Sequence, residues 1–264
     1  MRWFKPDGTS GKATTVPGGP GKVAVISVSP DDGWIAVALF DYTTKPVGET
    51  FYVEDFSGAK RVELRLNTNE YYWPVAWHGS AVVLARQNSA VASFPFTDPL
   101  PRGVPTDYRL LELAINTSPI GASFGPGLAP TDCMPSGSFP SSAGFVCTPS
   151  GGLGQHLVVR WSGESTAFMS NPSRQGGALS PDGTLIASCC HDGAGILIGS
   201  PTVGPRNTAA FGDVVLGGWV DATHVAFGVA GTPDIGILDT KTNTVLQPPS
   251  LREAMICDRL PAAR

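Results

Sequence analysis

The chain has 264 residues, 15% of them charged, and its net charge is −4. Its 18 basic residues are scattered. Because nucleic acid and anionic lipid are held chiefly by clustered Lys and Arg, the composition argues against a nucleic-acid partner. No apolar stretch reaches the roughly 18 residues that could cross a bilayer, and residues 1–6 lack the apolar core of a signal peptide. With 32 Gly, 24 Pro and no amphipathic helical window, the sequence predicts little helix.

A strand–turn–strand motif occurs twice, in residues 28–36 and 179–187. In each copy Pro presets φ at the second turn position, Asp bonds the backbone two residues on, and Gly takes a positive φ. Repeated hairpins predict an all-β chain, a β-propeller with four antiparallel strands in each blade. The 264 residues divide into six blades of 44, which lies within the period of about 40–50 residues that propeller blades show.

In chain order, an outer hairpin in residues 1–17 comes first and has no inner strand pair before it. Five inner strand pairs follow, each with an outer hairpin after it: 22–40, 74–86, 119–147, 176–190 and 214–230. The segment 251–264 is the remaining candidate to complete the blade that the N-terminal hairpin begins. Such a closure removes open sheet edges and makes residues 1–264 a single propeller domain. The alternatives are five blades with an accessory hairpin, or a fragment of a longer protein.

These repeats resemble those of TolB-like and WD40-like (PD40-type) β-propellers. The resemblance lies in the Ser-Pro-Asp turns of residues 28–36 and 179–187 and in the Leu-Asp-Thr at 238–240, and it covers most of the chain at the level of blades. The Gly-His and Trp-Asp dipeptides typical of WD40 proteins are absent, so it indicates a fold and repeat type but not a subfamily. It implies a platform for interactions, often extracytoplasmic in bacteria.

Two motifs suggest chemistry, and each has a structural interpretation that the sequence favours. Residues 121–125 fit the G-x-S-x-G pattern of a hydrolase nucleophile elbow, but Pro126 and Gly127 follow where a helix is needed. An inner strand and turn are therefore predicted there. Residues 189–192 read Cys-Cys-His-Asp, but neighbours in a strand face opposite ways, so buried thiols and a polar turn are favoured over a metal site. We expect no cofactor and no metal.

The spacing of two cysteines is informative about the cellular compartment of the protein. Cys133 and Cys147 flank a Ser-, Gly- and Pro-rich excursion, and a disulfide between them would stabilise it by about 3 kcal/mol. The pair favours an extracytoplasmic or cell-envelope location over a cytoplasmic one. Free buried thiols in a reducing compartment are the alternative.

The predicted function is non-enzymatic binding of a protein, peptide or surface ligand. Loops between strands two and three of a blade, and between successive blades, gather at one end of a propeller, its top face. Aromatic, Arg and amide side chains predicted there form a recognition surface. The candidates are Tyr72, Trp73, Arg86, Asn88, Arg174, His191 and Asp192.

Alternatives to this surface stay open. Tyr72 and Trp73 could instead pack between the first two blades. A propeller-type hydrolase or lyase would use His191 and Asp192 with Arg86 in the channel mouth, through general base and charge stabilisation. A structural subunit of a larger assembly would show an extended apolar patch and no convergent polar pocket.

Overall fold

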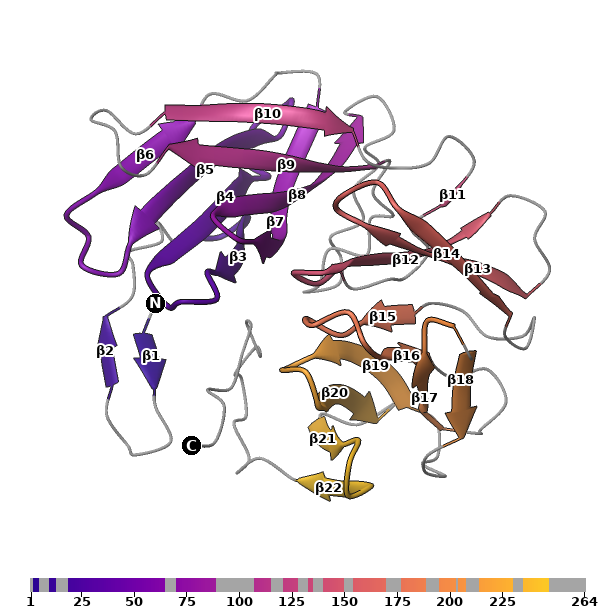
Figure 1. The fold of residues 1–264 in the computed structure, drawn as a ribbon. Helices are drawn as coiled ribbons and strands as arrows, with labels where there is room; N and C mark the ends of the chain where they lie inside the picture. Colours follow the sequence, from indigo (N-terminus) through magenta and orange to yellow (C-terminus); the bar gives the residue numbers. More distant parts are fainter. Residues whose placement is uncertain are drawn as a thin grey trace. The chain divides into compact units, whose positions relative to one another are not determined.

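The computed structural model describes residues 2–4, 10–12, 19–64, 70–88, 107–114, 121–127, 133–134, 140–149, 154–169, 177–188, 195–202, 204–207, 214–229 and 235–246. These residues form strands and turns (Figure 1). The chain divides after Gly127 into two compact units. None of the described residues forms a helix long and apolar enough to span a membrane.

The first unit contains two four-stranded antiparallel sheets and a small two-stranded sheet. The small sheet pairs β1 (Arg2–Phe4) with β2 (Ser10–Lys12). The first four-stranded sheet consists of β3 (Lys22–Val28), β4 (Trp34–Asp41), β5 (Gly48–Asp55) and β6 (Arg61–Leu64). The second consists of β7 (Glu70–His78), β8 (Ala81–Asn88), β9 (Asp107–Ala114) and β10 (Gly121–Gly127).

The second unit contains three further four-stranded antiparallel sheets. The third sheet has β11 (Cys133–Met134), β12 (Gly144–Pro149), β13 (Gln155–Arg160) and β14 (Ser165–Met169). The fourth has β15 (Gly177–Leu179), β16 (Ile186–Ser188), β17 (Leu197–Ser200) and β18 (Gly204–Asn207). The fifth has β19 (Val214–Trp219), β20 (His224–Val229), β21 (Ile235–Asp239) and β22 (Thr244–Leu246).

Every four-stranded sheet is a meander in which consecutive strands are neighbours, the order of a propeller blade. The all-β, blade-built prediction is therefore confirmed. The predicted count of six is wrong, because the described residues form five four-stranded blades, the number given as the alternative. Residues 251–264, proposed to close the ring, lie outside the described residues, so closure into a single domain stays a prediction.

Four of the predicted inner strand pairs are the first two strands of a blade, and one prediction is wrong. Gly121–Gly127, placed in an inner pair at 119–147, is instead β10, the outer strand of the second sheet. The inner pair of the third blade is β11 with β12. Residues 121–127 contain three Gly and one Pro, so they lack the alternation of apolar and polar residues that would have marked their place.

The repeated turns have a common physical basis, a buried serine that organises the hairpin. Ser29 Oγ accepts hydrogen bonds from the backbone N–H of Trp34 at 2.8 Å and donates to Asp31 at 2.5 Å. In the second copy, Ser180 Oγ accepts from the Leu185 N–H at 2.9 Å. A positive φ occurs in both turns, although in the first copy Asp32 rather than the following Gly adopts it.

Candidate binding surface on the second sheet

Two predicted binding residues, Tyr72 and Arg86, lie side by side on one face of the second sheet. Tyr72 is opposite Arg86 in the β7–β8 ladder, and Arg86 is opposite Asp107 in the β8–β9 ladder. Directly opposed residues project from the same face of a sheet, so these three residues form a row across three strands. Trp73 is opposite Ala85 and belongs to the other face.

Arg86 is the centre of a part-buried group of ion pairs. Its Nε and Nη2 donate to the two carboxylate oxygens of Asp107 at 2.6 and 2.8 Å, the bidentate geometry that suits a guanidinium. Its Nη1 donates to Glu70. The side chains of Arg86, Glu70 and Asp107 are 21%, 19% and 12% exposed. The bond to Asp107 is the main reason that the pKa of Arg86 is raised. Arg86 is therefore a fixed charge already neutralised by two carboxylates.

Tyr72 completes the polar part of this group. Its hydroxyl donates to Glu70. Burial, followed by this bond, raises the pKa of Tyr72 to about 12, and the same bond, with Arg86, lowers the pKa of Glu70. At neutral pH Tyr72 is therefore a neutral donor and Glu70 an ionised acceptor. A general acid or base works best with a pKa near the working pH, so this pair supports binding better than proton transfer.

The same face continues to Phe124 on β10 and Arg109 on β9. The Phe124 ring is 43% exposed, and its centroid lies 5.4 Å from that of Tyr72. Arg109 lies two residues beyond Asp107 on the same face. Its Nε is buried and has no hydrogen-bond partner. Arg109 forms no ion pair with a described carboxylate, but its charge helps to lower the pKa of Glu70. We call the following set the Arg86 cluster: Glu70, Tyr72, Arg86, Asp107, Arg109 and Phe124.

The serine of the G-x-S-x-G pattern lies on the same outer strand as Phe124. Ser123 is exposed in the middle of β10, opposite Glu112 of β9. A nucleophile elbow places its serine on a tight turn between a strand and a helix. A serine in the middle of a strand lacks that geometry, so the motif is a strand as predicted, although it is an outer strand and not the inner strand and turn that we expected.

The opposite face of β7 packs against the first sheet. The Tyr71 ring meets Phe40 edge-on at 6.2 Å, and its hydroxyl donates to the Val47 carbonyl at 3.3 Å. Both Tyr72 and Trp73 are 3% exposed. Their predicted place in exposed loops of a top face is therefore corrected: both lie within β7, and Trp73 shares the face turned toward the first sheet. Alternation along a strand lets a run of three aromatics bury itself on two faces.

Glu49 is a carboxyl at the junction of these two sheets. Both of its oxygens accept from the Tyr72 backbone N–H, each at 3.2 Å. It is opposite Phe40 in the β4–β5 ladder, which places it beside the aromatic contact with Tyr71. Burial raises the pKa of Glu49 to about 8, although the Tyr72 N–H acts in the opposite direction. Burial and then the charge of Glu49 raise the pKa of Tyr71.

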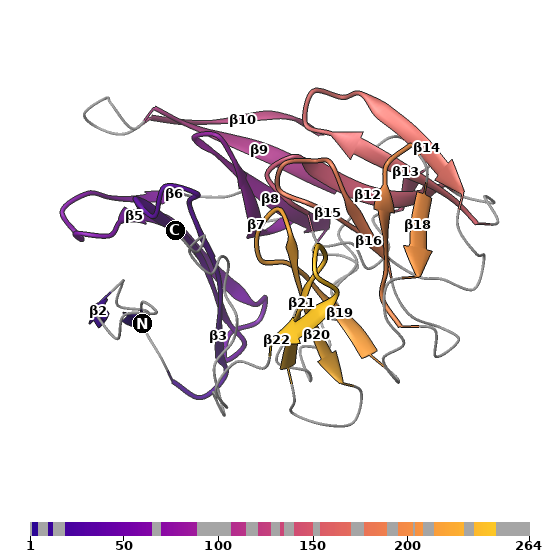
Figure 2. The same ribbon diagram turned by 60° about the horizontal axis from the view of Figure 1, so that its bottom comes forward.

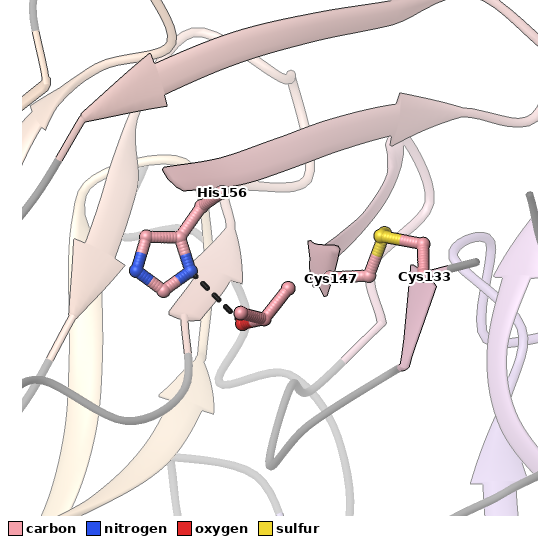
Figure 3. The surroundings of a disulfide bond; sticks show 4 residues. Cys133, Cys147 and His156 are labelled. Atoms are coloured by element: carbon pink, nitrogen blue, oxygen red, sulfur yellow. Dashed lines mark hydrogen bonds between the residues drawn. A yellow bond between two sulfur atoms is a disulfide. The ribbon is translucent and has the colours of Figure 1, made fainter. Parts of the chain in front are cut away.

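A disulfide joins Cys133 of β11 to Cys147 of β12, with 5.6 Å between their Cα atoms (Figure 3). Nearby, His156 is 4% exposed, stacks on Phe168 at 5.2 Å between centroids and lies 3.1 Å from the Thr148 hydroxyl through Nδ1. Burial lowers the pKa of His156. His156 is therefore a neutral core residue at neutral pH and not part of an exposed surface.

The turn between β19 and β20 holds an aspartate and histidine pair. His224 Nδ1 lies 2.8 Å from Asp221 Oδ2, and Asp221 also accepts from the Thr223 backbone N–H at 2.7 Å. Bonds from Thr223 and His224 outweigh burial and lower the pKa of Asp221. The pair caps its own turn. Within the described parts of the chain, no three His, Cys, Asp or Glu side chains are grouped to hold a metal ion.

The side chains of the remaining predicted residues are not described. Arg174, His191 and Asp192 lie outside the described residues, as do Cys189 and Cys190 of the Cys-Cys-His-Asp motif. Asn88 ends β8, opposite Glu70, and its side chain is not described. Their roles in binding or catalysis stay predictions.

Four members of the Arg86 cluster were not predicted from the sequence: Glu70, Asp107, Arg109 and Phe124. Glu70 begins β7 and Asp107 begins β9, so only the register of these strands with β8 brings the two carboxylates to Arg86. Phe124 had a signal in the sequence, since a large aromatic stands among small residues at 121–127. Its exposure followed only from the position of β10 at the outer edge.

No protein-family model and no curated protein matches this sequence. Among solved structures, the chain is similar to the β-propeller domain of Cps50 (Swd1) from Myceliophteria thermophila, with 8% identity, 89% of this chain and 87% of that chain covered, and a TM-score of 0.46. It is also similar to Hsv2 from Kluyveromyces lactis, with 10% identity, 83% and 75% covered, and a TM-score of 0.46. Sqt1 from Chaetomium thermophilum shares 15% identity over 87% and 62%, with a TM-score of 0.44. These TM-scores are too low for the similar proteins to indicate which partners this chain binds.

Proposed function

We propose that this chain is a non-enzymatic binding protein that engages a protein or peptide through the Arg86 cluster. The observation that carries the proposal is the exposed Phe124 ring, which rests against Tyr72 beside the unpartnered Nε of Arg109. Phe124 offers apolar area, and the part-exposed Arg109, whose Nε has no hydrogen-bond partner among the described residues, offers a positive charge. Aromatic and Arg side chains dominate binding hot spots.

The enzymatic alternative gains no support from the described residues. Its proposed Arg86 is bound to Glu70 and Asp107 and is not free to stabilise charge in a substrate. The disulfide between Cys133 and Cys147 supports the proposed extracytoplasmic location, since disulfides persist in oxidising compartments. A TolB-like subtype is part of the same proposal and rests on the Ser-Pro-Asp turns.

The test is selection of peptides from a random displayed library on the immobilised chain. We expect clones that bind the native chain and lose binding to Phe124→Ser and Arg109→Gln. Leu246→Ser is the matched control, because Leu246 is the other exposed large hydrophobic residue among those described, at 52% exposure on an outer strand of the fifth sheet.

Equal selection on the native chain and on Phe124→Ser would contradict the proposal, as would selection that depends on Leu246 alone. Circular dichroism spectra of the variants should match that of the native chain, because neither Phe124 nor Leu246 is buried.

A further inference from the structure

Among the described strands, none pairs with the far edge of the outer strand β10. Each four-stranded sheet ends in an outer strand, and β10, with seven residues, is longer than β6, β14, β18 and β22, which have four, five, four and three. Figures 1 and 2 both show β10 at the end of its sheet beside β9, the one described strand that pairs with it. Ala122, Ser123 and Phe124 are all exposed. An outer strand turns half of its N–H and C=O groups away from its neighbour, where another strand can pair with them.

Nothing in β10 itself protects this edge by charge. Natural edges often carry Lys or inward-pointing charged residues that block pairing. The first sheet has this protection, since its outer strand β6 contains Arg61 and Glu63. Residues 121–127 contain no charged residue. Pro126 and the irregularity between Phe124 and Gly127, where the register with β9 shifts, do limit pairing, so the open stretch is residues 121–124.

The strand register would allow a side chain of an added strand to reach Arg109 from this edge. The residue of β10 opposite Arg109 is Gly127, which has no side chain to stand between Arg109 and an added strand. Neighbouring strands are about 4.8 Å apart, so an added strand would run about 10 Å from β9. An Arg and a Glu side chain together span that distance. Arg109 is part-exposed as a whole, so an incoming carboxylate can approach its guanidinium, although the Nε, which lacks an acceptor, is itself buried.

We infer that β10 accepts an extended segment of a partner protein as a fifth strand, in which an apolar side chain packs on Phe124 and an acidic side chain reaches Arg109 across Gly127. The inference rests on the proposed function and adds the mode of binding and the chemistry of the partner. Backbone hydrogen bonds supply affinity in strand addition, and alternate side chains supply specificity.

A second copy of this chain fits the edge less well. Two β10 strands paired about a two-fold axis would place only uncharged residues beside each other, so Arg109 would gain no carboxylate from the second copy. A partner segment with an Asp or Glu supplies that carboxylate, so the occupant of the edge is an acidic extended peptide.

The probe is a capped ten-residue peptide of alternating Val and Thr with one Phe and one Glu. Two versions place Glu two or three residues from Phe, because the irregularity before Gly127 leaves either spacing possible. We expect the better version to bind about fivefold more tightly than the same peptide with Lys in place of Glu, the upper range for one partly exposed ion pair. Arg109→Gln should remove that preference, and Arg61→Gln, in the outer strand of the first sheet, should leave it unchanged.

Strand addition is tested by hydrogen exchange and by methylation of the peptide. Saturating peptide should slow amide exchange in residues 121–124, and N-methylation of alternate peptide amides should abolish binding in one of the two possible registers. Ser123→Lys, which charges the edge while leaving Phe124 and Arg109 in place, should weaken binding at least tenfold.

Three outcomes would overturn the inference. If binding requires Phe124 but exchange in 121–124 does not change, the strand-addition mode is wrong while the proposed function stands. If the Glu and Lys peptides bind alike, the acidic partner is wrong. If the chain alone sediments as a dimer that Ser123→Lys dissociates, the occupant is a second copy. Failure of library selection on the native chain would instead count against the proposed function itself.

Discussion

Replacing Glu49 by Gln should remove a pH dependence from the stability of the first unit. In the folded chain burial raises the pKa of Glu49 from its ordinary value of 4.5 to about 8. Between these values the folded chain keeps a proton that the unfolded chain has released. The free energy of unfolding therefore falls as pH rises from about 4.5 to 8, and the full penalty remains above that range. Gln is neutral throughout and still accepts from the Tyr72 N–H.

The size of the effect follows from the change in pKa. At 1.36 kcal/mol for each pKa unit, a rise from 4.5 to about 8 sets an upper limit of about 5 kcal/mol. Because Glu49 is only part-buried, solvent and local relaxation reduce this value. We expect Glu49→Gln to be more stable than the native chain by about 1–3 kcal/mol at pH 8.5 and nearly equal to it at pH 4.5.

The assay is urea denaturation followed by tryptophan fluorescence at intervals from pH 4.5 to 9. The difference between variant and native chain at each pH cancels the groups that both share. Carbon NMR of the Glu carboxyls provides a direct titration of Glu49. Glu63→Gln, on the exposed side of β6, is the control for the removal of one carboxylate. Parallel stability curves for Glu49→Gln and the native chain would refute the reasoning, since Glu49 would then be ionised and hydrated in the fold.

Three further substitutions test the packing. Arg86→Leu should cost about 2–4 kcal/mol in urea denaturation, because it leaves two part-buried carboxylates without their partner; a loss below about 0.5 kcal/mol would mean that water already solvates them. Gly183→Ala should destabilise more than Gly163→Ala, since both have positive φ but only the first would force a Cβ into the Arg160 guanidinium; equal losses would show that the guanidinium moves aside freely. Cys133→Ser should cost about 3 kcal/mol under oxidising conditions, and the difference should vanish in excess reductant.

Much of the local architecture was predictable from the sequence, because turn chemistry is written in neighbouring residues. The Ser-Pro-Asp turns, the strands on either side and the all-β class depend on short-range φ preferences and side-chain to backbone bonds. The Cys133 and Cys147 pair could be proposed for the same reason, since they flank one excursion of the chain. The strand prediction was wrong for residues 121–127, because they lack alternating apolar and polar residues. The predicted number of blades was wrong because dividing the chain length by a typical repeat length does not show which hairpins complete a sheet.

The Arg86 cluster and the Glu49 junction were decided by tertiary structure alone. Arg86 meets Asp107 because of the register between β8 and β9, and Glu49 meets the Tyr72 N–H because the first two sheets pack together. Neither contact can be predicted from the sequence, because the two partners are more than twenty positions apart along the chain. Whether an aromatic residue is buried, as Trp73 is, or exposed, as Phe124 is, depends on which strand is internal and which is outermost. The composition of a strand does not carry that information, because the position of a strand in its sheet is set by long-range pairing.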